Sequence, residues 1–554
     1  MAERTLDQPA SDDVPTVVIM AGGAELPRQF QVRSVTVTKS VNRIPFAIIE
    51  IADGDATTGE FELSDQDLLI PGAEVEIQAG YHSINETVFT GIVVRHAIRA
   101  RQGKLPVLHV VCKDPAVKLT VGRRSKYFYD TTDGTVMEDI ISAHGLTADV
   151  SGADTVQPQM VQYQCSDWDL LVSRAENNGL VVIAKDGTVS IAPPDPGQGE
   201  TITLELGATI LSFEAEFDAE SQWSTITTVA WDQAGQAPTE VEGEDPGFPD
   251  QGDFSAADLG AVIDLNDYRL HHGAALSGEE LEAWGRGIAV RSRLSKIRGR
   301  VRCQGFSGIE VGNVVKLERV GARFSGNAYV SGLRHHMTPD NWVTDLQTGI
   351  DVRPFHSQPD VELAPAAGVL PPIAGLHTGV VTALEGDPDG ENRIRVRLPL
   401  ISPEEDGVWT RIATLDAGAE RGTFFLPEID DEVVVGFLHA DPRHGVVLGM
   451  LHSSAKPAPF EASDDNHEKG YVSREKMRVV FNDDLKSIVI ETPDSNRVFT
   501  LDEDAGESRL EDADGNKITM SADGIVIESA ADLELTASGD IKLTATNIEN
   551  AASA

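Results

Sequence analysis

Apolar residues recur with a period of eight near the end of the chain. Two interleaved series have this spacing: Ile525, Leu533 and Ile541, and Ile527, Leu535 and Leu543. Within each unit the two apolar positions stand two residues apart, as in a strand with one buried face, and Gly or Asp occupies the corner. One strand per turn is too narrow to close a core, so the pattern predicts three chains wrapped into a prism whose strands lie about 4.7–4.9 Å apart.

Similar apolar pairs precede this regular region at uneven spacing. They are Val479/Phe481, Ile488/Ile490 and Ile518/Met520. These pairs predict a needle over residues 475–554 that starts loosely and becomes regular toward its end. The residues predicted to fill the core of the trimeric needle are Ile518, Met520, Ile525, Ile527, Leu533, Leu535, Ile541 and Leu543.

Residues 14–356 have the pattern of a β-rich hub with two barrel-like units. Runs such as FQVRSVTVTKS and AEVEIQAGY alternate with turn signals, which predicts a barrel or sandwich, and strand patterns resume from Ile297. Residues 1–13 are predicted to be a flexible N-terminus. Residues 233–260 are crowded with Gly, Pro and acidic side chains, so they are predicted to be a surface loop.

Short helices are expected within this region, including a helical insertion over about residues 130–180. Thr135–Glu138 has the form of a capping box, and Gly145 supplies a stop. Ser166–Asn178 carries an i, i+3, i+4, i+7 apolar stripe in which Trp168 is expected to anchor the core. Ser277–Glu280 is expected to cap a further helix.

The second half of the chain divides at a proline-rich segment. Residues 357–375 (SQPDVELAPAAGVLPPIAG) are predicted to be a linker between ordered domains. Five candidate strands follow over residues 376–453 and predict a small Greek-key barrel of the OB-fold type. Residues 454–474 are a polar connector to the needle. The predicted fold class is therefore mainly β: a β-barrel hub with a few short helices, an OB-fold barrel and a C-terminal trimeric intertwined β-helix.

Composition argues against several partners and environments. The chain has 554 residues, 41% of them apolar, and a formal net charge of −44, so nucleic acid and anionic membrane surfaces should repel it. Only three cysteines occur, which suggests neither a disulfide framework nor a zinc cluster. The N-terminus lacks the features of a secretory signal, and no stretch approaches 18 apolar residues. We expect a protein made in a bacterial cytoplasm without a signal peptide.

The sequence gives little support for a catalytic or metal-binding site. The acidic clusters Glu404–Asp406, Asp430–Glu432 and Asp502–Asp504 do not place two carboxylates across a cleft, as a glycosidase requires. His271–His272 and His335–His336 are strand neighbours that point to opposite faces, so neither pair predicts a metal site. We therefore expect no enzyme activity, no catalytic or metal-binding residues and no cofactor.

The barrel segment DPDGENRIRVRLPL, with GTFFLPEIDDEVVVGFLHADPRHGVVLGML after it, carries a family resemblance. It closely resembles the OB-fold domain of contractile-injection spike proteins, namely VgrG of type VI secretion and the central spike of contractile phage tails. The residues that fall where the family pattern has them include Trp409, Pro427, Gly436, Asp441, Pro442 and Gly449.

The resemblance extends over nearly the whole chain, from about Val14 to Asn550. QYQCSDWDLLVSRAENNGLVVIAKDGTVSIAPP is similar to the family's hub segment, and NRIPFAIIEIADGD resembles the spikes of extracellular or thylakoid-anchored phage-tail-like particles. Only about 20 residues separate Leu451 from Tyr471, too few for the lysozyme that some phage spikes carry there. The chain also ends soon after Glu549, so we expect a spike core without an appended toxin.

The resemblance implies a mechanical function. Three subunits would present six similar barrels, which adapts a sixfold tube to a threefold needle that pierces a target membrane without binding it stably. The implied partners are two further copies in a homotrimer, tube or tube-initiator proteins and baseplate components at the hub, and possible effector cargo. Unpaired strand edges at the blunt end imply a PAAR-type tip protein, expected at Leu543, Thr544 and Ile548.

Two alternatives remain at this point. A secreted β-solenoid carbohydrate-active enzyme or adhesin would need an aromatic-lined groove, whereas aromatic residues make up 6% of the chain and none lies in residues 521–554. A true type VI spike is the second alternative, and neighbouring genes would distinguish it from the spike of a phage-tail-like particle.

Overall fold

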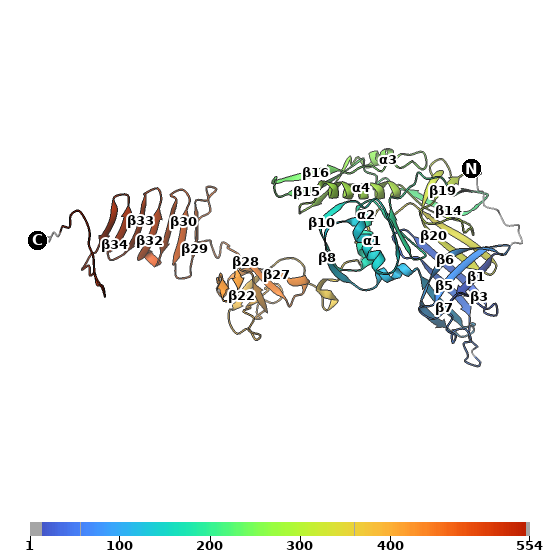
Figure 1. Cartoon of the computed structure of the whole chain (residues 1–554), viewed down its shortest axis with the longest axis horizontal. Coiled ribbons are helices and arrows are strands. Elements are labelled where there is room, and N and C mark those ends of the chain that lie inside the picture. The colour runs from blue at the N-terminus through green and yellow to red at the C-terminus, as the bar shows by residue number, and fades with distance from the viewer. Residues whose placement is uncertain (1–13, 56, 359–360, 550–554) are drawn as a thin grey trace. The chain divides into compact units, whose positions relative to one another are not determined.

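The computed structural model describes residues 14–55, 57–358 and 361–549, and it is mainly β, with 42% strand and 13% helix (Figure 1). The predicted N-terminal segment 1–13, residues 359–360 of the predicted linker and the last residues of the predicted needle, 550–554, lie outside this description. The chain forms two compact units, Met1–Ala364 (unit 1) and Pro365–Ala554 (unit 2), which divide inside the predicted linker.

Unit 1 is built on a 13-stranded sheet. Its main path runs β14-β18-β21-β20-β3-β4-β7-β6-β5-β1-β2, and β19 joins β13 to β20. The central β20–β3 pairing joins the end of the unit to its beginning, which brings the two β-rich halves predicted from the sequence into one sheet. The strands are β1 (Thr16–Ala21), β2 (Ala24–Glu25), β3 (Val32–Ser40), β4 (Phe46–Ala52), β5 (Glu74–Tyr81), β6 (Ile84–Arg99), β7 (Val107–Lys113), β13 (Ile202–Glu205), β14 (Ile210–Phe217), β18 (Ile297–Gln304), β19 (Val314–Glu318), β20 (Gly326–Thr338) and β21 (Asn341–Thr348).

Strict alternation of apolar residues decides which face of these strands is buried. In β4, Ala47, Ile49 and Ile51 are fully buried, and the intervening side chains are only partly covered. Side chains of a strand point alternately to the two faces, so every second position enters the core. Trp342 of β21 is also fully buried in this core, next to Tyr81.

A helical region occupies the middle of unit 1. The helix α1 (Asp133–Ala143) begins after Thr132, whose hydroxyl accepts a hydrogen bond from the Thr135 amide, so the predicted cap at Thr135 was wrong by three residues. Ser166 caps α2 (Asp167–Asn177), and Trp168 is buried as expected. The neighbouring elements are η1 (Pro115–Thr120), β8 (Arg124–Thr132), β9 (Thr147–Val150), β10 (Val156–Cys165), β11 (Val181–Lys185), β12 (Thr188–Ala192) and η2 (Phe355–Ser357).

The predicted surface loop at residues 233–260 was wrong in part. It contains β16 (Ala237–Glu242) and the start of α3 (Ala256–Ile263). β16 forms because it pairs with β15 (Thr225–Asp232), which also pairs with β17 (Asp267–His272). Such a tertiary partner is invisible in the local pattern, whereas the capping box of Ser255 and Asp258 was a readable helix signal.

The longest helix, α4 (Gly278–Ser295), has the capping box predicted at Ser277 and Glu280 and packs against β15 and α2. Close approach of the two helices requires a glycine. A Cβ at Gly287 would lie 2.3 Å from the carbonyl oxygen of Glu176 in α2. No side chain larger than hydrogen fits there without separating the helices.

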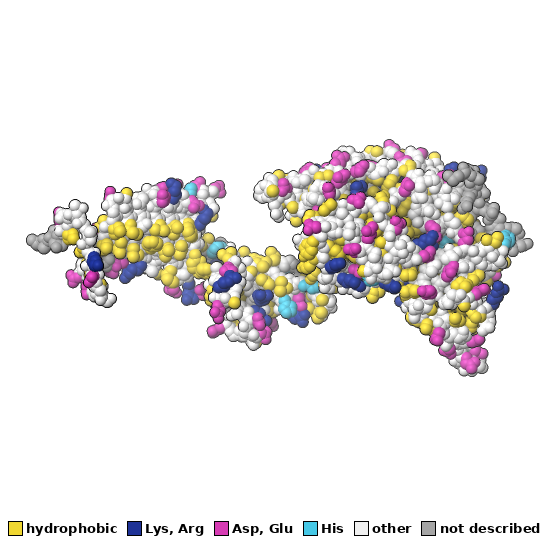
Figure 2. All heavy atoms as spheres, in the orientation of Figure 1, with side chains coloured by type: hydrophobic (Ala, Val, Ile, Leu, Met, Phe, Trp, Pro, Cys, Tyr) yellow, Lys and Arg dark blue, Asp and Glu magenta, His cyan; other side chains and the backbone are white. Residues whose placement is uncertain are grey.

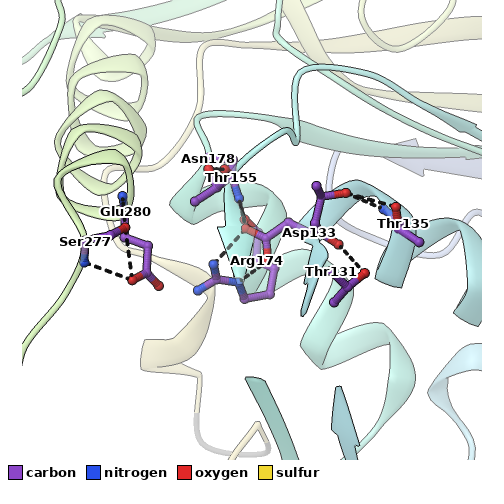
Figure 3. A network of polar contacts seen from close by, with 9 residues as sticks. Thr131, Asp133, Thr135, Thr155, Arg174, Asn178, Ser277 and Glu280 are labelled. Atoms are coloured by element: carbon purple, nitrogen blue, oxygen red, sulfur yellow. Dashed lines mark hydrogen bonds and ion pairs between the residues drawn. The ribbon is translucent and has the colours of Figure 1, made fainter. Parts of the chain in front are cut away.

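A polar network ties α1 to α2 (Figure 3). The Asp133 carboxylate, fully buried, accepts two hydrogen bonds from Arg174, at 2.9 and 2.7 Å, and a third from the Asn178 amide at 2.9 Å. Asn178 also accepts a hydrogen bond from the Thr155 hydroxyl at 2.7 Å. The network is stabilising as a whole because each buried polar atom finds a partner.

We predict that Arg174→Ala destabilises the α1–α2 region by about 3–5 kcal/mol, because the buried Asp133 carboxylate would lose its cation. Hydrogen exchange of α1 and α2 in the full chain, followed by mass spectrometry in increasing urea, measures this loss. Arg353→Ala is the matched control, since Arg353 is 79% exposed in its pair with Asp351 and should contribute less than about 1 kcal/mol. Equal protection in the two variants would contradict the prediction.

Unit 2 begins with a closed five-stranded barrel in the order β22-β23-β24-β28-β27. It occupies residues 377–450, within the range 376–453 assigned to an OB fold from the sequence, and Val381, Val396, Val433 and Val447 fill its core. Its elements are β22 (His377–Ala383), β23 (Ile394–Arg397), β24 (Val408–Ile412), β25 (Ala417–Gly418), β26 (Arg421–Gly422), β27 (Glu432–Phe437), η4 (Leu438–Ala440) and β28 (Gly445–Met450), preceded by η3 (Pro365–Gly368).

The rest of unit 2 is a seven-stranded sheet, here called the C-terminal sheet. Each strand is antiparallel to the next one in the sequence. Residues 529–549 form no strand. The octad pattern predicts strands there, but a strand needs a hydrogen-bonded neighbour and the chain supplies none. The elements are β29 (Glu468–Val472), β30 (Arg478–Asn482), β31 (Ser487–Glu491), η5 (Pro493–Ser495), β32 (Arg497–Asp502), β33 (Glu507–Asp512), β34 (Lys517–Ser521) and β35 (Gly524–Glu528).

Candidate functional site

One face of the C-terminal sheet carries two rows of apolar side chains, which together we call the apolar face. In each row, residues of adjacent strands stand directly opposite one another, where their Cβ atoms lie about 4.5–5.5 Å apart. The first row is Tyr471, Val479, Ile490, Phe499, Leu510, Ile518 and Ile527. The second row is apolar except at Ser508, and it consists of Phe481, Ile488, Leu501, Ser508, Met520 and Ile525.

The apolar face is open to solvent in the single chain. Leu510, Met520 and Ile527 are 51%, 48% and 52% exposed. Figure 2 shows the face as a continuous hydrophobic band across the strands. Exposed contiguous apolar surface of this kind marks an interaction site, because soluble proteins otherwise keep such patches small.

The opposite face of the same sheet is mixed. It carries ion pairs beside the valines Val472, Val480, Val489, Val498 and Val526. Arg478 forms an ion pair with Glu491, and Arg509 binds Glu507 at 3.0 Å and Glu511 at 3.3 Å. The sheet is therefore two-sided, with contiguous apolar rows on one face and ion pairs among smaller apolar side chains on the other.

The structure brings half of the predicted needle core together. Ile518, Met520, Ile525 and Ile527 all lie on the apolar face. The other four predicted residues lie beyond the last strand and are 52–69% exposed: Leu533, Leu535, Ile541 and Leu543. The tip residues Thr544 and Ile548 are likewise exposed in this segment.

Sequence reasoning missed several members of the apolar face. Phe499, Leu501 and Leu510 were not singled out, although RVFTLD and ESRLED show the same alternation as the pairs that were. Tyr471 was assigned to the connector rather than to a strand. The turn lengths in this region vary, so the alternation breaks at each turn and no fixed period reveals the rows.

The residues of the OB-fold signature support the barrel. Trp409, Gly436 and Gly449 lie in β24, β27 and β28, and Pro427 is buried. Asp441 and Pro442 form the turn between the last two of these strands. Two hydrogen bonds from the Arg443 side chain, at 3.0 and 2.6 Å, with help from its backbone amide, lower the pKa of Asp441 to about 2. This pair shapes a turn and has no substrate cleft beside it.

The histidine and acidic candidates do not assemble into a centre. Among the residues that the structure describes, no group of three or more His, Cys, Asp or Glu side chains could hold a metal ion. His271 and His272 are exposed on β17, and the acidic run Glu404–Asp406 lies on an exposed loop. His335 is buried and His336 is half-buried, as alternation along β20 requires.

Burial, aided by the nearby charge of Lys39, lowers the pKa of His335 to about 3. Its ring nitrogen Nδ1 lies 2.9 Å from the Thr344 hydroxyl, so the neutral ring is hydrogen-bonded within the core. Because the folded pKa lies below the unfolded value of about 6.5, the unfolded state binds the proton first. The contribution to stability is complete above about pH 6.5 and declines as the pH falls toward 3.

We predict that His335 removes about 2 kcal/mol of stability from unit 1 when the pH falls from 6.5 to 5. His335→Gln should make this decline shallower, even where it lowers stability at pH 7. Calorimetric melting of the full chain between pH 5 and 7 measures both slopes. His271→Gln serves as the control, since that side chain is exposed, and identical slopes for all three proteins would refute the prediction.

Two family models match parts of the chain. Residues 377–452 match the type VI secretion system/phage-baseplate injector OB domain, and residues 11–339 match the Alg8 N-terminal domain model. The sequence is similar to VgrG spike proteins, so the chain is VgrG-like. Because the second model spans more than half of its length, the chain belongs to the Alg8 N-terminal domain family.

The curated relatives align over limited parts. The type VI spike protein VgrG1b of Pseudomonas aeruginosa is 24% identical, over 38% of this chain and 29% of its own length. VgrG3 of Vibrio cholerae is 28% identical, over 17% of this chain and 10% of its own length. This chain thus spans less than a third of either relative.

Solved structures with a related course include a tail protein from Neisseria meningitidis, with a TM-score of 0.45 and 14% identity over 61% of this chain and 97% of that one. The E. coli c3393 protein, a component of the type VI secretion system, has a TM-score of 0.41 and 12% identity over 78% of this chain and 99% of that one. No helix among the described residues is long and apolar enough to cross a membrane.

Proposed function

We propose that three copies of this chain join through the apolar face to form the central spike of a contractile, phage-tail-like injection apparatus. The observation that carries the proposal is the unbroken register of apolar residues across seven strands. The match of residues 377–452 to an injector OB domain and the similarity to VgrG spikes support the same role.

Three identical sheets packed face to face would bury the apolar rows around one axis. Each Val, Leu, Ile, Phe or Met that is fully buried contributes about 1.5–3 kcal/mol. The charged outer face would remain in water, where salt screens repulsion beyond about 10 Å. Beyond Glu528, the exposed residues Leu533, Leu535, Ile541 and Leu543 would enter the same core as strands paired between chains.

We predict that Phe499→Asp prevents assembly, because three carboxylates would meet in the middle of the apolar core. Native mass spectrometry should give three times 59.5 kDa for the wild type and the monomer mass for this variant. Val526→Asp adds the same charge to the outer face of the sheet, where Val526 is 54% exposed, and should leave the trimer intact. A monomeric wild type, or a trimeric Phe499→Asp variant, would refute the proposal.

The finer roles follow from this assembly. The six barrel-like units of a trimeric hub would seat on tube or baseplate proteins of sixfold symmetry, and the OB barrel (376–453) would surround the base of the needle. The needle (475–554) would transmit the force of sheath contraction to a target membrane. Its blunt end would expose strand edges that a PAAR-type tip protein covers at Leu543, Thr544 and Ile548. Effector cargo would travel with such a particle after synthesis in a bacterial cytoplasm.

We predict that a chain truncated after Gly524 loses capture of a PAAR-type tip protein in a pull-down, because the proposed contact residues are removed. The truncated chain should stay soluble, and circular dichroism should show that unit 1 stays folded, since the core of unit 1 is untouched. Capture that persists at wild-type level would place the tip elsewhere on the molecule.

A further inference from the structure

Unit 1 contains a cavity of about 560 Å³ that the proposed spike role does not use. Its wall comes from the end of β3, the following loop, the end of β7, the segment after η1, the start of α2 and the residues around η2. A volume of this size accepts a peptide segment or a small organic molecule.

The cavity is basic, although the chain as a whole is strongly acidic. Arg43, Lys113 and Arg123 line it from three separate segments, and Asp169 is the one carboxylate among the described lining residues. The Asp169 carboxylate already accepts a hydrogen bond from Ser166 at 2.5 Å. Positive charge therefore exceeds negative charge here, in a chain of net charge −44.

The three cations differ in the hydrogen bonds and ion pairs that they form within the chain. Arg123 donates to the backbone oxygens of Gln164, Val361 and Glu362, at 2.7, 3.3 and 3.2 Å, which fixes its guanidinium at the rim. Neither Arg43 nor Lys113 has an ion-pair partner in the described part of the chain. Two cations without an ion-pair partner that face one cavity provide a site for an external anion.

Apolar side chains in the lining of the cavity limit the kinds of ligand that it can bind. Ile44, Phe46, Trp168 and Phe355 line the cavity beside the cations. A bare inorganic anion gains nothing from these surfaces, whereas a peptide segment can place carboxylates on the cations and apolar side chains on the rings.

We propose that this cavity binds a segment rich in Asp and Glu, with some apolar residues, carried by another protein of the particle. The inference rests on the proposed function only for the identity of that particle. Charge complementarity favours this attachment: the chain as a whole is strongly acidic, whereas the described lining of the cavity carries three cations and one carboxylate, so an acidic segment is attracted there.

The test is fluorescence anisotropy of the full-length protein with a fluorescein-labelled peptide rich in Asp, Glu and Leu, beside its Asn/Gln counterpart. Only the acidic peptide should bind, and more weakly as salt rises from about 0.05 to 0.3 M. Arg43→Ala with Lys113→Ala should weaken binding about tenfold. Arg43→Lys with Lys113→Arg keeps both charges and should retain most of the affinity.

The matched control is Arg101→Ala with Lys104→Ala, which removes the same charge from two exposed residues that have no ion pair among the described residues. It should change affinity less than about twofold. Binding that is equal in the two double variants, or equal for both peptides, overturns the proposal. Inorganic phosphate that binds as tightly as the peptide also overturns it, in favour of a small-anion site. Native mass of the same samples separates failure here from failure of trimer formation.

Discussion

The need to cover the apolar face is the constraint on which unit 2 depends. A seven-stranded antiparallel sheet satisfies most of its backbone hydrogen bonds within one chain, but it leaves two rows of Ile, Leu, Phe and Met against water. The face behind them is less suited to turn inward, because the Arg478 guanidinium, whose side chain is 45% exposed, would then lose water. The cover must therefore be apolar, and a surface identical to itself meets that requirement by symmetry.

Unit 1 differs from unit 2, because it joins many elements that lie far apart in the sequence within one chain. Its sheet returns from β20 to β3 across almost 300 residues of sequence, and the helices α1, α2 and α4 close over the middle. The Asp133–Arg174–Asn178 network and the Gly287 contact fix these helices in place. Such a rigid unit suits a part that receives force, because its close-packed core deforms little.

The sequence revealed much of this architecture because alternation and capping are local signals. The predicted helix at Ser277, the buried Trp168 and the apolar pairs at Ile488/Ile490 and Ile518/Met520 are all features that a short window contains. Strand β16 was missed because it exists through its pairing with β15, and Thr132 was missed as a cap because Thr131, Thr132 and Thr135 stand close together at the start of α1. The basic cavity could not be predicted, because Arg43, Lys113 and Arg123 converge only through tertiary contacts.

The C-terminal sheet pairs only neighbours in sequence, from β29 to β35, whereas residues 529–549 form no strand pairing with the described part of the chain. Contacts between sequence neighbours form quickly, since little loop entropy is lost. In the proposed trimer, each chain would contribute a preformed sheet, and residues 529–549 would form strands only after the three chains had met. Folding of the needle would then proceed from the C-terminal sheet toward the end of the chain, which would become rigid last.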